Sequence, residues 1–190
     1  MPKSESATPP ASGASVILDA PAIQRILRRI AHEIIEGNPD LDKVALVGIP
    51  SRGIEMARRI ADYIEQFEHH PVATGVIDVS MHRDDLNLRP RLSLVAPTHL
   101  PDDLEERTIV LVDDVLYSGR TCRAAMDAIS SFGRPPRIQY AVLIDRGHRE
   151  LPIRADYVGK NLPTSPGERV FVRLEALDHQ PDAVWISKPE

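Results

Sequence analysis

The sequence predicts an α/β protein whose central, mostly parallel sheet is covered by helices on both faces. Runs of consecutive apolar residues alternate along the chain with segments of helical periodicity, and strands that are apolar on both faces are typical of parallel sheets buried between helices. The chain has 190 residues, of which 42% are hydrophobic and 27% charged, which suits one globular domain. We expect this domain over residues 15–190, after a flexible tail, 1–14, rich in Pro, Ser and Ala.

The first predicted helix follows Asp19, a plausible N-cap, and ends at Gly37, because Ile and Leu recur between them with helical spacing. Arg25, Arg28, Arg29 and His32 occupy the opposite face of this helix. The next elements are a strand at 44–49, a helix at 54–67, a β-rich run at 72–80, a strand at 108–112, a helix at 120–132 and a strand at 138–144.

Two further segments complete the predicted domain. The β-rich runs at 169–174 and 183–187 have no helix pattern between them and are expected to form a hairpin-like addition or a hood over the sheet edge. Residues 81–101 show little periodicity and form too long a connection for a compact domain, which favours a flexible lid over an idle loop. A disordered surface loop is the alternative.

Composition and charge exclude several functional classes. A formal net charge of −5 argues against a uniformly basic nucleic-acid-binding surface, although a local basic patch stays open. The single cysteine excludes an internal disulfide and indicates a reducing compartment, hence the cytoplasm. No apolar run is long enough to span a membrane, and the N-terminus lacks the apolar core of a signal peptide.

The segment 110–121, VLVDDVLYSGRT, is the most informative in the chain. A buried strand delivers Asp113 and Asp114 to its carboxyl end, and small or hydroxylic residues then lead directly into a helix. Such a helix start exposes backbone N–H groups and predicts a phosphate site. The two carboxylates repel phosphate but suit ribose hydroxyls or a metal ion chelated by them, so the segment predicts a site for ribose 5-phosphate rather than a mere turn and cap.

A second anion site is predicted after the first strand of the sheet. There Ser51, Arg52 and Gly53 stand just before a helix start and combine a hydroxyl, a guanidinium and an unobstructed backbone. Cys122 lies in helical register with Met126 and Ile129, so we interpret it as a core thiol rather than a nucleophile.

The string at 110–121 resembles the phosphoribosyl pyrophosphate (PRPP) motif of the type I phosphoribosyltransferases. The longer strings DVSMHRDDL, VDDVLYSGRTCRAAMDAI and RGHRELPIRADYVGKN resemble, more specifically, the bifunctional pyrimidine operon attenuator and uracil phosphoribosyltransferase family, and this similarity runs from about Ile17 to the C-terminus. The resemblance implies a type I phosphoribosyltransferase fold and the reaction of uracil with PRPP to give UMP and pyrophosphate, with Mg²⁺. It also implies binding of a pyrimidine-operon mRNA leader, dependent on uridine nucleotides (UMP or UTP), and a homodimer or higher homo-oligomer.

Site residues are carried over from the family by matching positions. The implied catalytic residues are Asp113, Asp114 and Arg52, with Mg²⁺ reaching the site through PRPP near the two aspartates. The implied substrate-binding residues are Ser51, Arg52, Arg83, Arg91, Asp113, Asp114, Val115, Leu116, Tyr117, Ser118, Gly119, Arg120, Thr121, Arg146 and Val170; the implied RNA-binding residues are Arg28, His32, Arg149, Arg154 and Lys160. Arg28 replaces a Thr that the family often has there, and His82 a Tyr.

Two other functions stay open at this point. One is an RNA-binding regulator with weak catalysis, in which uridine nucleotides act mainly as effectors. The other is a purine phosphoribosyltransferase. Aromatic residues make up only 4% of the chain, so base stacking on a sheet surface is not expected, and RNA contacts would be mainly to phosphates and loop bases.

Overall fold

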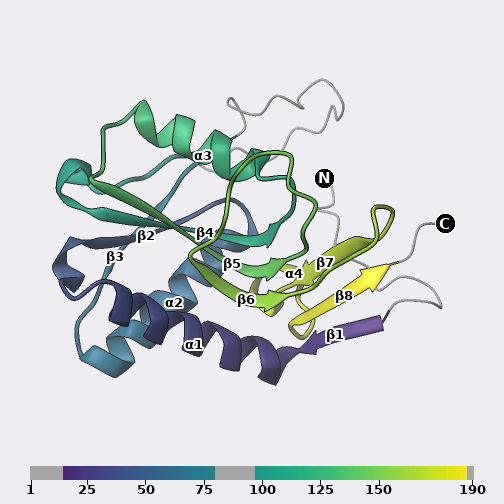
Figure 1. Ribbon diagram of the computed structural model, residues 1–190. Coiled ribbons are helices and arrows are strands. Elements are labelled where there is room, and N and C mark those ends of the chain that lie inside the picture. Colours follow the sequence, from purple (N-terminus) through teal and green to yellow (C-terminus); the bar gives the residue numbers. More distant parts are fainter. Residues whose placement is uncertain (1–14, 80–96, 188–190) are drawn as a thin grey trace.

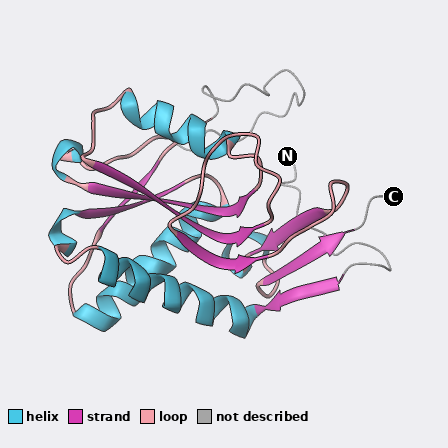
Figure 2. Ribbon diagram, in the orientation of Figure 1, coloured by secondary structure: helices cyan, strands magenta, loops and turns pink. Residues whose placement is uncertain are grey.

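The computed structural model describes residues 15–79 and 97–187. The predicted tail and most of the predicted lid, with Arg83, Arg89 and Arg91, lie outside these residues. Two sheets organise the described chain, a parallel sheet in the order β3-β2-β4-β5-β6 and a smaller sheet in the order β1-β8-β7 (Figure 1). The helices and strands of the chain are coloured by type in Figure 2.

All neighbouring strands of the larger sheet are parallel, as predicted. Its strands are β2 (Val44–Gly48), β3 (Ala73–Val76), β4 (Thr108–Leu116), β5 (Arg137–Asp145) and β6 (Tyr157–Asn161). Every residue of β2 is buried, because helices cover the sheet on both sides. The predicted α/β class is therefore confirmed.

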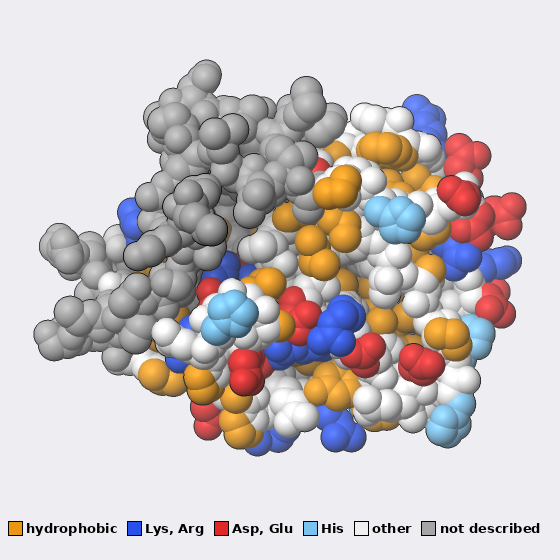
Figure 3. Space-filling model, turned by 180° about the vertical axis from the view of Figure 1, so that it is seen from behind, with side chains coloured by type: hydrophobic (Ala, Val, Ile, Leu, Met, Phe, Trp, Pro, Cys, Tyr) orange, Lys and Arg blue, Asp and Glu red, His pale blue; other side chains and the backbone are white. Residues whose placement is uncertain are grey.

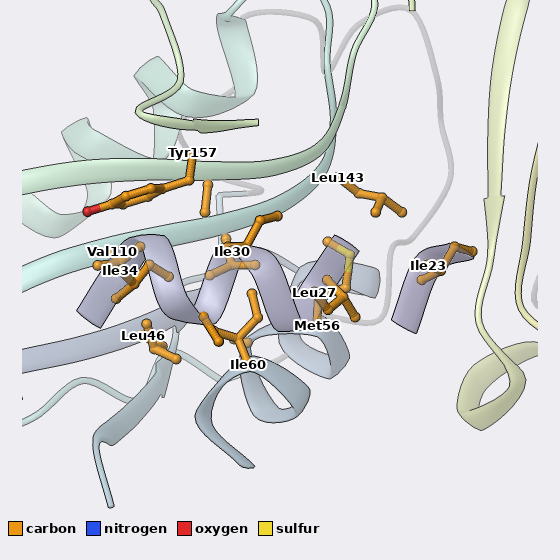
Figure 4. Close-up of a cluster of buried hydrophobic side chains, with 14 of the residues drawn as sticks. Ile23, Leu27, Ile30, Ile34, Leu46, Met56, Ile60, Val110, Leu143 and Tyr157 are labelled. Atoms are coloured by element: carbon orange, nitrogen blue, oxygen red, sulfur yellow. The ribbon is translucent and has the colours of Figure 1, made fainter. Parts of the chain in front are cut away.

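Helices α1 (Ala20–Gly37) and α2 (Arg52–Glu68) cover one face of this sheet, and α3 (Arg120–Ser130) covers the other. The predicted N-cap of α1 is confirmed, since the Asp19 carboxylate accepts a hydrogen bond of 2.9 Å from the Ala22 amide. Figure 4 shows how the apolar face of α1 packs between α2 and the strands. The labelled side chains there are Ile23, Leu27, Ile30 and Ile34 of α1, Met56 and Ile60 of α2, and Leu46, Val110, Leu143 and Tyr157 of the sheet.

The smaller sheet is the predicted hood. Its strands β7 (Arg169–Arg173) and β8 (Ala183–Ser187) are antiparallel, and β1 (Ser15–Asp19) joins the outer edge of β8. The expectation of no helix between the two C-terminal strands was wrong, because a one-turn helix, α4 (Glu175–Asp178), lies there. The hood lies beyond the carboxyl ends of the parallel strands, next to the start of α2 (Figure 1).

Other elements also differ from the prediction. Strand β4 runs to Leu116, four residues beyond the apolar run, so Asp113 and Asp114 belong to the strand itself. Helix α2 begins at Arg52 rather than near Ile54. Strand β6, an edge strand with the polar sequence YVGKN, was not predicted. Within the described residues, no helix is both long and apolar enough to cross a membrane.

Candidate functional site

Three loops meet at the carboxyl end of the parallel sheet. They follow β2, β4 and β5, which are adjacent strands in the order β2-β4-β5. The Ile49 amide donates to the Val112 carbonyl at 2.9 Å, and the Arg146 amide donates to the Leu116 carbonyl at 3.1 Å. Both predicted anion loops are thus side by side, where ligands of open parallel sheets bind.

The loop after β2 is held against β4 by two glycines. A Cβ atom on Gly53 would lie 2.2 Å from the Val112 carbonyl oxygen, and one on Gly48 would lie 2.4 Å from the Ile54 Cα. Only glycine permits such close approach of backbone to backbone. The Pro50–Ser51 peptide bond in this loop is cis. This packing places the start of α2 directly beside the strand that carries the two aspartates.

The loop after β4 (117–121), named the phosphate loop for the phosphate site that the sequence predicts there, has the form of an anion site. Its carbonyl groups point inward: the Tyr117 oxygen accepts from Arg149, and the Ser118 oxygen accepts from the Glu150 and Leu151 amides at 3.0 and 3.1 Å. In contrast, the amides of Ser118, Gly119 and Thr121 donate to no acceptor among residues 15–79 and 97–187. Gly119 has a φ of 92°, a left-handed conformation that turns the chain into α3.

The two aspartates have different environments, because neighbouring strand residues point to opposite faces of a sheet. The Asp113 carboxylate is buried and accepts hydrogen bonds from the Tyr140 hydroxyl at 3.1 Å and the Asp114 amide at 2.9 Å. Asp114 is half-buried, and its carboxylate accepts a hydrogen bond of 2.9 Å from the Val115 amide. Asp114 is therefore the carboxylate available to a ligand, whereas Asp113 is buried on the opposite face of the sheet.

Burial, reinforced by the charge of Asp114, raises the pKa of Asp113 well above its usual range. Burial, with the charge of Asp113, likewise raises the pKa of the Tyr140 hydroxyl, so Tyr140 stays protonated and donates to Asp113. A buried carboxylate beside a second carboxylate costs folding free energy at neutral pH. This cost indicates that Asp113 serves the site rather than the fold.

We expect the substitution Asp113→Asn to raise the melting temperature of the ligand-free protein at neutral pH while lowering its activity. Because the pKa of Asp113 is higher in the folded protein than in the unfolded chain, its contribution to stability is present below the usual carboxyl pKa of 3.8 and is lost as the pH rises. The gain in melting temperature should therefore be smallest below pH 3.8 and grow as the pH rises above it. A gain independent of pH in calorimetry, or equal to that of the exposed control Asp127→Asn, would contradict this explanation.

Arg52 is the first residue of α2 and is ion-paired with the hood. Its Nη2 atom donates to both carboxylate oxygens of Asp178 in α4, at 3.0 and 3.2 Å. Ser51, which precedes it, is exposed and makes no capping hydrogen bond. Of the second anion loop, the Ser51 side chain is thus exposed, whereas the Arg52 guanidinium is largely buried against the hood.

Arg146 is buried beneath the phosphate loop rather than open to solvent. Its guanidinium lies 4.2 Å from the centre of the Tyr117 ring, and it donates to the Thr164 hydroxyl at 3.1 Å and the Glu168 carbonyl at 2.7 Å. Glu168 leads into β7, where Val170 is partly buried. The two residues expected to border a uracil pocket are therefore joined through the start of the hood.

The predicted RNA-binding residues fall into two groups. In α1, His32 stacks on Phe67 of α2 with ring centres 4.0 Å apart, and the Arg28 guanidinium lies over the same ring at 5.5 Å. Arg28 and His32 also line a surface hollow with Arg25, Arg29, Glu33 and Glu36. The acidic members of this hollow reduce its positive charge. On the face seen in Figure 3, acidic and basic side chains are likewise intermixed over the described residues.

The second group belongs to the loop before β6 and to β6 itself. Arg154 and Lys160 are exposed. In β6, Gly159 faces Ile26 of α1, so the alternation of the strand directs Lys160 to the other face of the sheet. The structure therefore does not bring the five predicted residues onto one flat face, and an RNA that touches both groups would have to pass around the edge strand.

The Arg149 side chain bonds to other parts of the protein. Its guanidinium donates to the carbonyls of Tyr117 and Ile153, each at 2.9 Å, and forms an ion pair with Asp145. These bonds hold residues 145–153 against the phosphate loop. Its role in RNA binding stays a prediction.

The two adjacent aspartates fit a Mg²⁺ ion that arrives with a substrate. Within the described residues, no group of three His, Cys, Asp or Glu side chains could hold a metal ion. Mg²⁺ is commonly held by one or two carboxylates together with substrate phosphates. Asp114, which keeps free acceptor positions, is the residue that could share such an ion with a phosphorylated sugar.

Cys122 is a core residue, as predicted. It is buried against the phosphate loop, and burial, with the charges of Asp113 and Asp156, raises the pKa of its thiol to about 12. A thiol that stays protonated is a poor nucleophile.

Sequence reasoning missed two polar residues of this site, Tyr140 and Asp178. Tyr140 is a hydroxyl within an otherwise apolar strand, which is a usable signal, since a buried hydroxyl needs a partner. Asp178 gave no signal, because it lies 126 positions from Arg52 and only the hood brings them together.

Comparison with known proteins identifies the relatives of this chain. Residues 13–176 match the model of the phosphoribosyl transferase domain. The chain is 56% identical over 174 residues to "Bifunctional protein PyrR" of Roseiflexus sp., which covers 92% of this chain and 95% of that protein. It is 53% identical over 178 residues to the protein of that name from Bacillus subtilis, covering 93% and 98% of the two chains.

Solved structures support the fold. The hypoxanthine phosphoribosyltransferase of Trypanosoma cruzi in complex with IMP superposes with a TM-score of 0.69 at 17% identity, covering 96% of this chain and 95% of that one. The hypoxanthine-guanine enzyme of Leishmania tarentolae in complex with GMP gives 0.68 at 19% identity, covering 94% and 99%. At these identities the likeness concerns the fold alone.

Proposed function

Since this chain belongs to the PyrR family of phosphoribosyltransferases, we propose that it converts uracil and PRPP into UMP and pyrophosphate, and that it also binds pyrimidine-operon mRNA leader under the control of uridine nucleotides. One observation carries the enzymatic proposal. The half-buried Asp114, a loop with three amides that bond no acceptor in the described part of the chain, and the arginine of a second loop lie together at the carboxyl ends of β2 and β4. These groups match a ribose, its 5-phosphate and the pyrophosphate of PRPP, respectively.

Each of these protein groups binds a different part of PRPP. The amides of Ser118, Gly119 and Thr121, at the start of α3, bind the 5-phosphate. Arg120 and the segment from Val115 to Tyr117 shape this loop, and the Asp114 carboxylate accepts hydrogen bonds from the ribose hydroxyls. Arg52, with the Ser51 hydroxyl, binds the pyrophosphate, on which negative charge develops as the bond to the ribose breaks. Positive charge on the ribose is stabilised by Asp114 and, from the buried face of β4, by Asp113.

Catalysis here rests on positioning and electrostatics, and no covalent nucleophile is required. When bound with PRPP, Mg²⁺ would neutralise charge on the leaving pyrophosphate. Arg146 and Val170 border the uracil, and Arg146 is fixed there by Tyr117, Thr164 and Glu168. Arg83 and Arg91 of the predicted lid, which lie outside the described residues, are proposed to bind the pyrophosphate as well.

The enzymatic proposal is tested by incubating the protein with PRPP, Mg²⁺ and either uracil, hypoxanthine or guanine. We expect UMP formation with uracil to exceed product formation with both purines. Faster reaction of either purine would instead support a purine phosphoribosyltransferase. Absence of UMP formation would leave the alternative of an RNA-binding regulator that uses uridine nucleotides only as effectors.

RNA binding is proposed for the exposed cations Arg154 and Lys160, together with Arg28 and His32 on α1. Arg149 holds the loop that presents Arg154, in addition to any RNA contact of its own. Clustered cations on a chain of net charge −5 create a local field that attracts phosphate groups. Assembly into a dimer or larger homo-oligomer and location in the cytoplasm belong to the same proposal.

The double substitution Arg154→Ala and Lys160→Ala is expected to weaken binding of a pyrimidine-operon leader RNA. Affinity for RNA falls as salt rises, and each lost phosphate contact should make the plot of log affinity against log salt less steep by about 0.7 for single-stranded RNA. The matched control is Arg137→Ala, which removes an exposed charge at the opposite end of the sheet, where β5 begins. Filter binding with and without UMP at several salt concentrations measures both the affinity for the RNA and its dependence on salt. Equal effects of the control and the double variant would contradict the assigned surface.

A further inference from the structure

The hood and the start of α2 are joined by a largely buried ion pair between Asp178 and Arg52. The Asp178 side chain is only 6% exposed, and that of Arg52 is 21% exposed. The Arg52 Nη2 atom contacts both oxygens of the carboxylate. The Nε atom is buried and has no acceptor among the described residues. Asp178 therefore holds the guanidinium through Nη2 alone, and the Nε hydrogen on the same edge has no acceptor in the described part of the chain.

The Asp178 carboxylate is itself fixed by the backbone. Its carboxylate accepts a hydrogen bond of 2.9 Å from the Leu174 amide, across the single turn of α4. Leu174 is completely buried in the core shared by α1, α2 and the sheet. The position of the carboxylate is thus set by the core rather than by a mobile side chain.

We propose that Asp178 is a positioning residue for the reaction, which holds the Arg52 guanidinium where it can bind the pyrophosphate of PRPP. An arginine side chain has many rotamers, and fixing one of them before the ligand arrives removes an entropic cost from binding. The hood would then have a part in the reaction beyond bordering the base. This inference rests on the proposed role of Arg52 as a pyrophosphate ligand.

The structure contains a matched control on the same helix. Arg59, two turns along α2 from Arg52, forms an ion pair with Asp182 at 2.5 Å, and Asp182 in turn accepts from the Glu175 amide at 2.8 Å. This pair also joins α2 to the hood and is similarly buried, with side chains 20% and 10% exposed. It differs from the first pair in lying away from the loop after β2.

The test compares Asp178→Ala, Asp182→Ala and Arg52→Ala in the full chain by steady-state kinetics and thermal unfolding. We expect Asp178→Ala to raise the KM for PRPP by about 10- to 100-fold, as misplacement of a binding group does, and to leave the KM for uracil unchanged. Asp182→Ala should lower the melting temperature comparably but leave both KM values at those of the wild type. If the alanine variant does not fold, Asp178→Asn retains the shape and one acceptor oxygen and should show a smaller rise.

The double variant Arg52→Ala with Asp178→Ala tests whether Asp178 acts through Arg52. Its KM for PRPP should equal that of Arg52→Ala alone, because a positioning residue has no effect once its target is removed. Additive effects, an unchanged KM in Asp178→Ala, or a lower KM, as expected if Asp178 competes with pyrophosphate, would each overturn the inference. An unchanged KM in Arg52→Ala would instead refute the proposed role of Arg52 itself.

Discussion

Replacing Asp114 with asparagine is expected to lower kcat/KM for UMP formation by about 100-fold or more, in the range found when one preorganised electrostatic group is removed from an active site. Two physical effects add. The amide lacks the negative charge that stabilises the developing positive charge on the ribose. It also presents N–H donors where the ribose hydroxyls need acceptors.

Fold and stability should be affected little by this substitution. The Asp114 carboxylate accepts a hydrogen bond from the Val115 amide, and the asparagine oxygen can accept it as well. Activity is measured with PRPP, uracil and Mg²⁺, and thermal unfolding checks the fold. The matched control is Asp127→Asn, which removes a carboxylate from the exposed face of α3. Wild-type activity in Asp114→Asn would exclude this carboxylate from the reaction and with it the proposed ribose site.

A large loss of folding stability is expected for Gly53→Ala. The new Cβ would meet three backbone atoms of β4, of which the Val112 carbonyl oxygen is nearest, at 2.2 Å. That oxygen also accepts the Ile49 amide, so it cannot move without breaking the bond that joins the two anion loops. We expect a loss of about 3 kcal/mol or more in the free energy of unfolding, at or above the upper end for overpacking, because backbone has little freedom to yield.

Activity should fall with stability in this variant, since the same shift separates Arg52 from Asp114. Urea denaturation gives the free energy, and kinetics at a temperature where the variant is folded gives the activity. Gly133→Ala is the control: its new Cβ would have the Leu104 side chain as its nearest neighbour, at 3.2 Å, and a side chain can rotate away. A Gly53→Ala protein as stable and active as this control would show that the two loops are not rigidly packed.

The regular elements were predictable wherever their signals are local. The 3.6-residue repeat of α1, its cap at Asp19 and the apolar strands β2, β4 and β5 depend on neighbours in sequence, and the structure confirms them. The edge strand β6 escaped prediction because it is partly exposed and so carries no apolar run. The N-terminal strand β1 escaped because its pairing partner, β8, lies far along the chain. The helix α4 escaped because a single turn is too short to show a helical repeat.

For the candidate site, the sequence by itself determined which residues carry charge and which strands deliver them to one edge of the sheet. It could not rank Asp113 and Asp114, because burial separates these neighbours and burial is a property of the packed sheet. It did not show that Arg149 supports the phosphate loop or that Asp178 holds Arg52, since both contacts join distant parts of the chain. The chemical groups were thus fixed locally, and their positions and pKa values were decided only by tertiary packing.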